Sequence, residues 1–253
     1  MAHPLRLRQV CLAAPRLEPV VDDLQAILGL QVCHRDPGLI AYGLENALLP
    51  VGTDFIEVVA PVQADTAAGR FIRRSRGHGG YMAIFQAEQP RAAQARAAAL
   101  GVRTAHEIDR PAYQSVQLHP RDCRAAFIEL GHSPGGDDRQ QGTWWPAGPH
   151  WQAGMRTEVT QRLLGIVLES PEPAVLLAHW ARILGLPDAA PVLQVDGTAI
   201  SAEPGPADAL GAMLLAVADV DAVLDRAVDR GLRVQGSSFH LAGMHFRLQA
   251  TAG

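Results

Sequence analysis

The chain has 253 residues, of which 48% are hydrophobic and 19% are charged, and its formal net charge is −4. This composition is typical of a globular protein with a sizeable core, and it excludes a long disordered or highly charged chain. The sequence has no basic tract and no apolar run approaching the ~20 residues of a membrane span. We therefore expect neither nucleic acid nor a membrane as a partner.

Two further features narrow the chemistry. No lysine occurs in the sequence, which excludes Schiff-base catalysis and a Walker-type phosphate loop, because both need a lysine. The cysteines Cys11, Cys33 and Cys123 are far apart and form neither a C-x-x-C motif nor a zinc-site spacing. They predict reduced thiols and a cytoplasmic protein.

The first part of the chain has the pattern of a strand followed by a helix. Residues 7–13 predict a strand, and residues 17–30 carry apolar side chains at helical spacing. Gly29 stands where a helix C-cap belongs. Turn residues then separate short runs that predict strands: 31–34, 38–43, 46–51 and 54–60.

The same order recurs three times. A second unit has a strand at 81–87, a helix at 90–100 and strands near 103–109, 115–119 and 125–130. The third and fourth units have strands at 162–169 and 213–218 and helices at 173–186 and 220–230, each with shorter following strands. Ile27-Leu28-Gly29-Leu30 at the end of the first helix recurs as Ile183-Leu184-Gly185-Leu186 at the end of the third.

This internal repetition predicts the architecture. Each unit is βαβββ, and we expect an α+β fold of tandem paired βαβββ units that form cupped mixed sheets with helices on the outer face. Residues 131–156 are rich in Gly, Pro, Asp and Trp, which is typical of a linker. The predicted organisation is a first half over residues 1–130, this linker, and a degenerate second half over residues 157–253.

Two stretches resemble a known superfamily. The run Asn46-Ala47-Leu48-Leu49-Pro50-Val51-Gly52, continuing into Phe55-Ile56-Glu57-Val58-Val59, resembles hairpin strands of glyoxalase-like proteins. The run Gln117-Leu118-His119-Pro120-Arg121-Asp122, continuing into Phe127-Ile128-Glu129-Leu130, resembles a hairpin of the epimerases. With the paired units, they are similar to the vicinal oxygen chelate superfamily, which includes glyoxalase I, methylmalonyl-CoA epimerase, extradiol dioxygenases and bleomycin-resistance proteins.

The resemblance implies a divalent metal ion (Mg, Mn, Ni or Zn) held inside a cupped sheet by one residue from each of four strands. Carried over by position, the ligands are Gln9, Glu57 and Glu129. Met82 stands where the superfamily usually has a histidine. In such a site Glu57 and Glu129 are also the candidate catalytic bases.

Side-chain alternation along the strands indicates the same residues without the family. Ile56 and Val58 share one face of their strand, and Glu57 faces the other way. Glu129 is likewise opposite to its apolar neighbours in sequence. A carboxylate inside a protein needs a cation or another partner, so a metal ion and a salt bridge to an arginine remain the two interpretations.

Further residues are candidates for the cavity. Met82 is expected to contribute apolar lining, and His119 to lie at the rim or at a strand end. Arg121 would either clamp a substrate carboxylate or phosphate in a bidentate manner or pair with Asp122 on the surface. His78 is an alternative fourth ligand. It stands four residues before Met82, and a bulge at the glycines that flank it would bring it closer to the site.

In the second half, no equivalent set of carboxylate and imidazole groups stands at the matching positions, which are Leu163, Met213 and Arg247. This half is therefore predicted to be structural, and it would either complete the fold or cover the cavity of the first half. The linker tryptophans Trp144, Trp145 and Trp151 would either cover the cavity mouth or join the two halves.

These features leave two functions open. The first is a metal-assisted isomerase or lyase that acts on a small oxygenated substrate. The second is a non-catalytic small-molecule-binding protein of the drug-sequestering type, whose apolar cavity needs no metal. An extradiol dioxygenase is less consistent with the sequence. Its Fe(II) requires two histidines and a carboxylate, and the candidate strands carry no such set. The expected partner is a small-molecule ligand, and the chain is expected to be a monomer or a homodimer.

Overall fold

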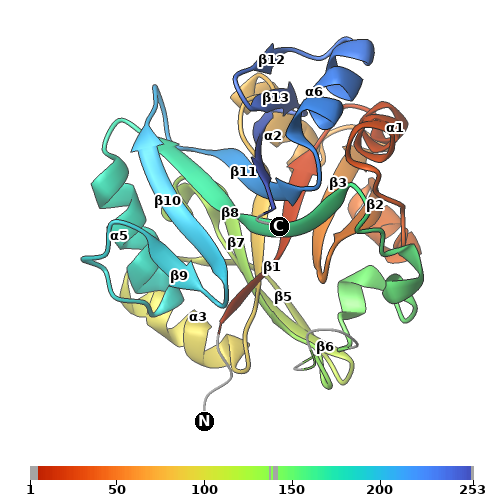
Figure 1. The fold of residues 1–253 in the computed structure, drawn as a ribbon. Helices are drawn as coiled ribbons and strands as arrows, with labels where there is room; N and C mark the ends of the chain where they lie inside the picture. Colours follow the sequence, from red (N-terminus) through yellow and green to blue (C-terminus); the bar gives the residue numbers. More distant parts are fainter. Residues whose placement is uncertain (1–4, 137, 139–141, 252–253) are drawn as a thin grey trace.

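The computed structural model describes residues 5–136, 138 and 142–251. Two seven-stranded mixed sheets form the molecule, one from each half of the chain (Figure 1). The strand order is β2-β3-β1-β4-β7-β6-β5 in the first sheet and β12-β13-β14-β11-β8-β10-β9 in the second. The predicted α+β architecture of paired units is confirmed.

Residues before β8 build the first sheet and the elements around it. Its strands are β1 (Arg6–Ala13), β2 (Leu44–Val51), β3 (Asp54–Pro61), β4 (Met82–Gln86), β5 (Thr104–Arg110), β6 (Tyr113–Leu118) and β7 (Phe127–His132). Its helices are α1 (Leu17–Leu28), η1 (Pro37–Tyr42), α2 (Ala67–Ser75), α3 (Pro90–Ala99) and α4 (Pro120–Cys123).

The remaining elements build the connection and the second sheet. Two short 3₁₀ helices, η2 (Trp145–Ala147) and η3 (Trp151–Gly154), lie in the linker. The strands of the second sheet are β8 (Thr160–Ser170), β9 (Leu193–Val195), β10 (Thr198–Pro204), β11 (Ala209–Val217), β12 (Val234–Gln235), β13 (Ser238–Leu241) and β14 (Met244–Ala250). Its helices are α5 (Pro173–Leu184) and α6 (Val220–Asp229).

In each sheet the two units join at their first strands. β1 pairs antiparallel with β4 and parallel with β3, and β8 pairs in the same way with β11 and β10. The repeated glycines end the equivalent helices, because Gly29 and Gly185 both adopt the left-handed conformation with φ near +70°. A glycine adopts this conformation without a steric penalty.

The structure corrects two local predictions. Residues 38–43 form most of the 3₁₀ helix η1 instead of a strand, because Pro37 stands at its start and the Asp36 carboxylate accepts from the Gly38 N–H. Of the predicted strand at 31–34, only His34 forms a bridge, to Leu48. The helix α2, rich in arginine, was not predicted. Part of the predicted linker, residues 137 and 139–141, lies outside the described residues, as do residues 1–4 of the first half.

One hydrophobic core joins the two sheets. It contains the helix-facing side chains of the first sheet, such as Ile56 and Ile128, together with those of the second, such as Ile166 and Met213. Helix α1 contacts α6, and α3 contacts α5 (Figure 1). Helices α1 and α3 pack on the face of the first sheet that is opposite Gln9, Glu57 and Glu129, whereas α2 packs on the same face as these residues. No helix in the described part of the chain is long and apolar enough to cross a membrane.

Candidate functional site

The concave face of the first sheet carries the three predicted polar residues. Gln9 lies beside Phe55 on β3 and Ile84 on β4, and Ile84 lies beside Glu129 on β7. Glu57 lies beside Cys11. Side chains directly across neighbouring strands share a face, so Gln9, Glu57 and Glu129 all point away from the helices, as their alternation predicts.

Glu57 is 8% exposed and accepts two hydrogen bonds from side-chain amides. Asn46 Nδ2 donates to one carboxylate oxygen at 2.7 Å and Gln9 Nε2 to the other at 2.8 Å. Burial raises the pKa of Glu57 above its ordinary value, and the hydrogen bonds from Asn46, Cys11 and Gln9 oppose this rise without cancelling it. The charge of Glu129 raises the pKa further.

Glu129 has its own pair of donors. The Tyr113 hydroxyl donates to one oxygen at 2.7 Å, and Gln117 Nε2 donates to the other at 2.8 Å. Both donors come from β6, the strand next to β7. Neither Glu57 nor Glu129 pairs with an arginine in the described structure, so the salt-bridge interpretation is not what the structure shows.

Cys11 and Met82 lie between the two carboxylates on neighbouring strands. Cys11 is fully buried, and burial and the charge of Glu57 raise the pKa of its thiol. Met82 is 8% exposed and packs in the apolar cluster on this face. The three cysteines are unpaired.

A segment that we call the clasp, residues 142–154, fills the concave face of the first sheet. Trp144 and Trp151 are almost completely buried. The Trp144 indole N–H donates to Gln9 Oε1 at 2.9 Å, and Trp151 packs edge-on against Phe55 with ring centroids 5.2 Å apart. Of the two predicted roles for the linker tryptophans, the structure shows packing against this cavity.

The residues present do not fit a divalent ion. Each oxygen of Glu57 and Glu129 already accepts a hydrogen bond, and the Gln9 carbonyl accepts from Trp144. These N–H and O–H donors point at the oxygens that would have to face a cation, and their positive ends would repel it. Among the described residues, no group of three or more His, Cys, Asp or Glu side chains could hold a metal. His78, the alternative ligand, pairs with Glu169 of the second half instead.

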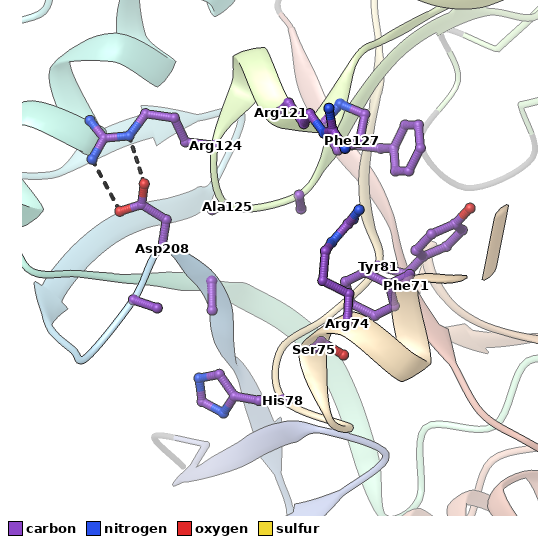
Figure 2. A pocket seen from close by; sticks show the side chains of 14 residues that line it. Phe71, Arg74, Ser75, His78, Tyr81, Arg121, Arg124, Ala125, Phe127 and Asp208 are labelled. Atoms are coloured by element: carbon purple, nitrogen blue, oxygen red, sulfur yellow. Dashed lines mark hydrogen bonds and ion pairs between the residues drawn. The ribbon is translucent and has the colours of Figure 1, made fainter. Parts of the chain in front are cut away.

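An open pocket lies beside this filled cavity. We call it the junction pocket; its volume is about 380 Å³, and α2, α4, the start of β7 and the loop before β11 line it (Figure 2). Phe71, Tyr81 and Phe127 form an aromatic wall, with centroid separations of 5.1 Å from Tyr81 to each of the other two. Both halves of the chain therefore contribute to the pocket.

Three arginines line the junction pocket. Arg124 donates from Nε to Asp208 Oδ2 at 2.7 Å and from Nη2 to Oδ1 at 3.1 Å. Burial raises the pKa of Asp208, but the hydrogen bonds from Arg124 and Ser170 lower it more, so the net shift is downward. Arg74 on α2 and Arg121 on α4 have no carboxylate partner among the described residues.

The other predicted substrate residues are separated by the fold. His119 caps α4, where its Nδ1 accepts from the Arg121 N–H at 3.3 Å. Asp122 pairs with Arg103 and not with Arg121, so the predicted surface pair does not form. Arg121 lines the junction pocket, and Met82 lies on the filled concave face.

The polar face of the second sheet carries Arg247, which stands at a matching position, and three groups that were not predicted from the sequence: Glu203, His240 and His245. Arg247 pairs with Glu203, and His240 lies against His245 with ring centroids 5.1 Å apart. Burial lowers the pKa of His240, and the nearby His245 and His78 lower it further. Comparing single matching positions could not find them. The sequence does carry a signal for them: His240 in β13, and His245, Arg247 and Gln249 in β14, alternate with apolar residues.

Comparisons with known proteins agree with this fold. A family model described as a glyoxalase-like domain matches residues 10–184. A hypothetical protein from Staphylococcus aureus is 11% identical, with a TM-score of 0.64 over 98% of this chain and 99% of that one. It therefore shows the same fold over both halves.

Methylmalonyl-CoA epimerases match one part of the chain. That of Streptomyces coelicolor, in complex with 2-nitronate-propionyl-CoA, is 24% identical, with a TM-score of 0.46 over 51% of this chain and 98% of that one. The enzyme from Mycobacterium tuberculosis is 23% identical, with a TM-score of 0.45 over 52% and 89%. No curated protein matches the sequence. Because the family model covers more than half of the residues, the chain belongs to the glyoxalase-like domain family of the vicinal oxygen chelate superfamily.

Proposed function

We propose that this glyoxalase-like protein binds a small organic molecule in the junction pocket, and that it does so without a metal ion. The observation that carries the proposal is the contrast between two places on the first half. Trp144 and Trp151 fill the concave face, whereas the neighbouring pocket of about 380 Å³ stays open. This volume lies within the roughly 300–1,000 Å³ range of small-molecule sites.

The backbone beside the pocket supports the same proposal. Arg124 adopts φ +76° and ψ −75°, a conformation that non-glycine residues rarely adopt. Backbone strain of this kind is concentrated at binding sites, where the surrounding structure holds it in place. Here the bidentate pair with Asp208 of the second half fixes the Arg124 side chain.

The test is to block the pocket from its rim. Ala207 is exposed and lines the pocket, so Ala207→Trp should obstruct it without disturbing the core. A screen of small organic molecules by thermal shift should give ligands that raise the melting temperature of the wild type but not of Ala207→Trp. Ala92→Trp, at an exposed alanine on α3, is the matched control and should keep the response. Ligands that bind equally well to Ala207→Trp would refute the site.

The metal-free part has a separate test. Saturating EDTA should leave the melting temperature and the ligand response unchanged, and neither Mg²⁺, Mn²⁺, Ni²⁺ nor Zn²⁺ should raise them. Stoichiometric metal in protein purified without a histidine tag, lost together with ligand binding on chelation, would contradict this part of the proposal.

A metal-free isomerase is the second candidate function. It is favoured by the raised pKa of Glu57, because a raised pKa brings a carboxylate closer to the proton affinity that a general base needs at neutral pH. In this function the ligand would bind on the concave face in place of the clasp, Glu57 would take a carbon-bound proton from it, and Glu129 is the second candidate base.

Proton exchange distinguishes the two functions. A ligand whose thermal-shift response persists in Ala207→Trp binds outside the junction pocket, and it should exchange a carbon-bound hydrogen for deuterium in D₂O, as followed by NMR, if the protein catalyses proton transfer on the concave face. Glu57→Gln should then abolish exchange and keep binding. Binding without exchange in the wild type would leave the non-catalytic function.

A further inference from the structure

We infer that the ligand of the junction pocket is an organic anion, a carboxylate or phosphate on an apolar body, held by Arg74 and Arg121. The inference rests on the proposed function and adds the chemical class of the ligand. In the pocket, Arg74, Arg121 and Arg124 face a single acidic lining residue, Asp208.

The acidic groups near the pocket are already engaged. Both oxygens of Asp208 accept from Arg124, and Oδ1 also accepts from the Ser170 hydroxyl at 2.6 Å. Glu169 does not line the pocket, but it contacts the lining residue His78, with 3.1 Å between Glu169 Oε2 and His78 Nε2. Neither carboxylate pairs with Arg74 or Arg121 among the described residues.

Two guanidinium groups that share one pocket without a counter-charge repel each other, and a bound anion removes that repulsion. They come from different elements, Arg74 from α2 and Arg121 from α4, and Figure 2 shows Arg74 extending toward Arg121. A planar guanidinium donates two parallel hydrogen bonds to a carboxylate or phosphate. The two arginines can therefore hold one anionic group between them.

A third polar group in the pocket lacks a partner. Ser75 lines the pocket, and within the described residues its hydroxyl oxygen is buried without a hydrogen-bond partner. A buried hydroxyl without a partner costs free energy. Ser75 follows Arg74 on the last turn of α2.

The remaining lining selects the body of the ligand. The rings of Phe71, Tyr81 and Phe127 and the small side chains of Ala125 and Ala126 offer an apolar surface. Burial raises the pKa of Tyr81, and the charges of Cys11 and Glu57 raise it further, so its hydroxyl stays protonated and neutral. An inorganic anion would leave this wall uncovered, whereas an aromatic or aliphatic group would pack on it.

Isothermal titration calorimetry with matched probes tests the inference. Hydrocinnamate and phenyl phosphate carry an anion on an aromatic body, hydrocinnamyl alcohol is the neutral analogue, and inorganic phosphate lacks the body. We expect both organic anions to bind at least about tenfold more tightly than the alcohol and than inorganic phosphate. Their affinity should fall as NaCl is added, because exposed charges are screened.

Two variants assign the effect to the arginines. Arg74→Gln and Arg121→Gln should each weaken binding of the anions by about tenfold or more and leave binding of the alcohol unchanged. Arg73→Gln is the matched control, because Arg73 precedes Arg74 on α2 and pairs with Asp65. All three residues are exposed, and unchanged melting temperatures would confirm that the variants fold.

The outcomes separate the two proposals. If the alcohol binds as tightly as hydrocinnamate, or if Arg73→Gln weakens binding as much as the other variants, the anion inference is overturned while the proposed function stands. If the alcohol and both organic anions fail to bind at millimolar concentration and the thermal-shift screen also yields no ligand, the proposed function fails as well.

Discussion

At Glu57, burial and hydrogen bonding act in opposite directions on one carboxyl group. The three donors Asn46, Gln9 and Cys11 favour the charged form, but burial disfavours it more, so the pKa is raised from its ordinary value of 4.5. The folded chain therefore binds the Glu57 proton more tightly than the unfolded chain. The contribution of Glu57 to the free energy of unfolding is fully present when the pH is below its ordinary pKa. It is lost as the pH rises through the raised pKa of the folded chain.

Glu57→Gln tests this sign. The variant puts an amide N–H₂ against a neighbouring amide donor, so it should lower the free energy of unfolding by about 1–3 kcal/mol. The deficit relative to the wild type should be larger near pH 5 than near pH 8, because only the wild type loses stability as Glu57 ionises. Urea denaturation at both pH values measures it. A deficit that grows with pH would contradict the raised pKa.

Arg124 combines an unfavourable backbone conformation with a bidentate ion pair. Its φ of +76° strains a residue with a Cβ atom but not a glycine. Arg124→Ala and Arg124→Gly both remove the pair with Asp208 and differ only in the backbone cost. The glycine variant should therefore be the more stable by about 1 kcal/mol in urea denaturation. Equal stability, or a more stable alanine variant, would show that this backbone is not strained.

At the scale of elements, the clasp determines what the first sheet can do. It places the Trp144 indole on Gln9, and Trp144 also meets the Tyr113 ring edge-on at 5.7 Å. Because Tyr113 and Gln9 donate to Glu129 and Glu57, the clasp is connected through one intermediate residue to both carboxylates. The aromatic filling and the hydrogen-bond network therefore support each other.

Substitutions in the clasp separate these contributions. Trp144→Phe should lower the free energy of unfolding by about 1–3 kcal/mol, because it leaves the buried Gln9 carbonyl without its donor. Trp144→Ala also creates a cavity and should cost about 3–5 kcal/mol. Trp145→Phe, at a half-buried neighbour, is the control and should cost less than about 1 kcal/mol. Chemical denaturation gives all three values, and equal costs at Trp144 and Trp145 would contradict this role.

How far the sequence predicts each element depends on its periodicity. In the strands that carry Glu57 and Glu129, each carboxylate stands between two apolar residues that face the helices, so the direction of both side chains is predicted and confirmed. The Gly- and Pro-rich linker has no hydrophobic periodicity. Its sequence therefore does not show whether its tryptophans fill the cavity or join the two halves. In 38–43, apolar residues suggest a strand, but Pro37 and Gly38 start a 3₁₀ helix instead.

The junction pocket could not be predicted for a different reason. Its walls come from α2, α4 and the loop before β11, which are distant in sequence. Of its arginines, only Arg121 is singled out by the sequence, through the hairpin that resembles the epimerases. Arg74 and Asp208 carry no motif, and only the packing of the two halves brings them to one place.

At the scale of the whole molecule, the two halves share a core and buried polar contacts. The Trp180 indole N–H of α5 donates to the Cys123 carbonyl at 2.9 Å, and the Thr160 hydroxyl donates to the Leu28 carbonyl at 2.8 Å. Trp180 is fully buried in the common core. Neither half can therefore unfold without exposing apolar surface and unpaired polar groups of the other.

The shared core predicts that the chain unfolds as a single cooperative unit. Differential scanning calorimetry should show one transition with a ratio of calorimetric to van't Hoff enthalpy near one.

Trp180→Ala should lower the free energy of unfolding by about 3–5 kcal/mol and still give one transition, because the loss affects both halves. Hydrogen exchange should then speed up equally in β7 and β11. Val175→Ala, at an exposed residue of the same helix, should change stability by less than about 0.5 kcal/mol. Two separate transitions, or faster exchange confined to the second sheet, would mean that the halves fold independently and that the junction pocket lies between two autonomous domains.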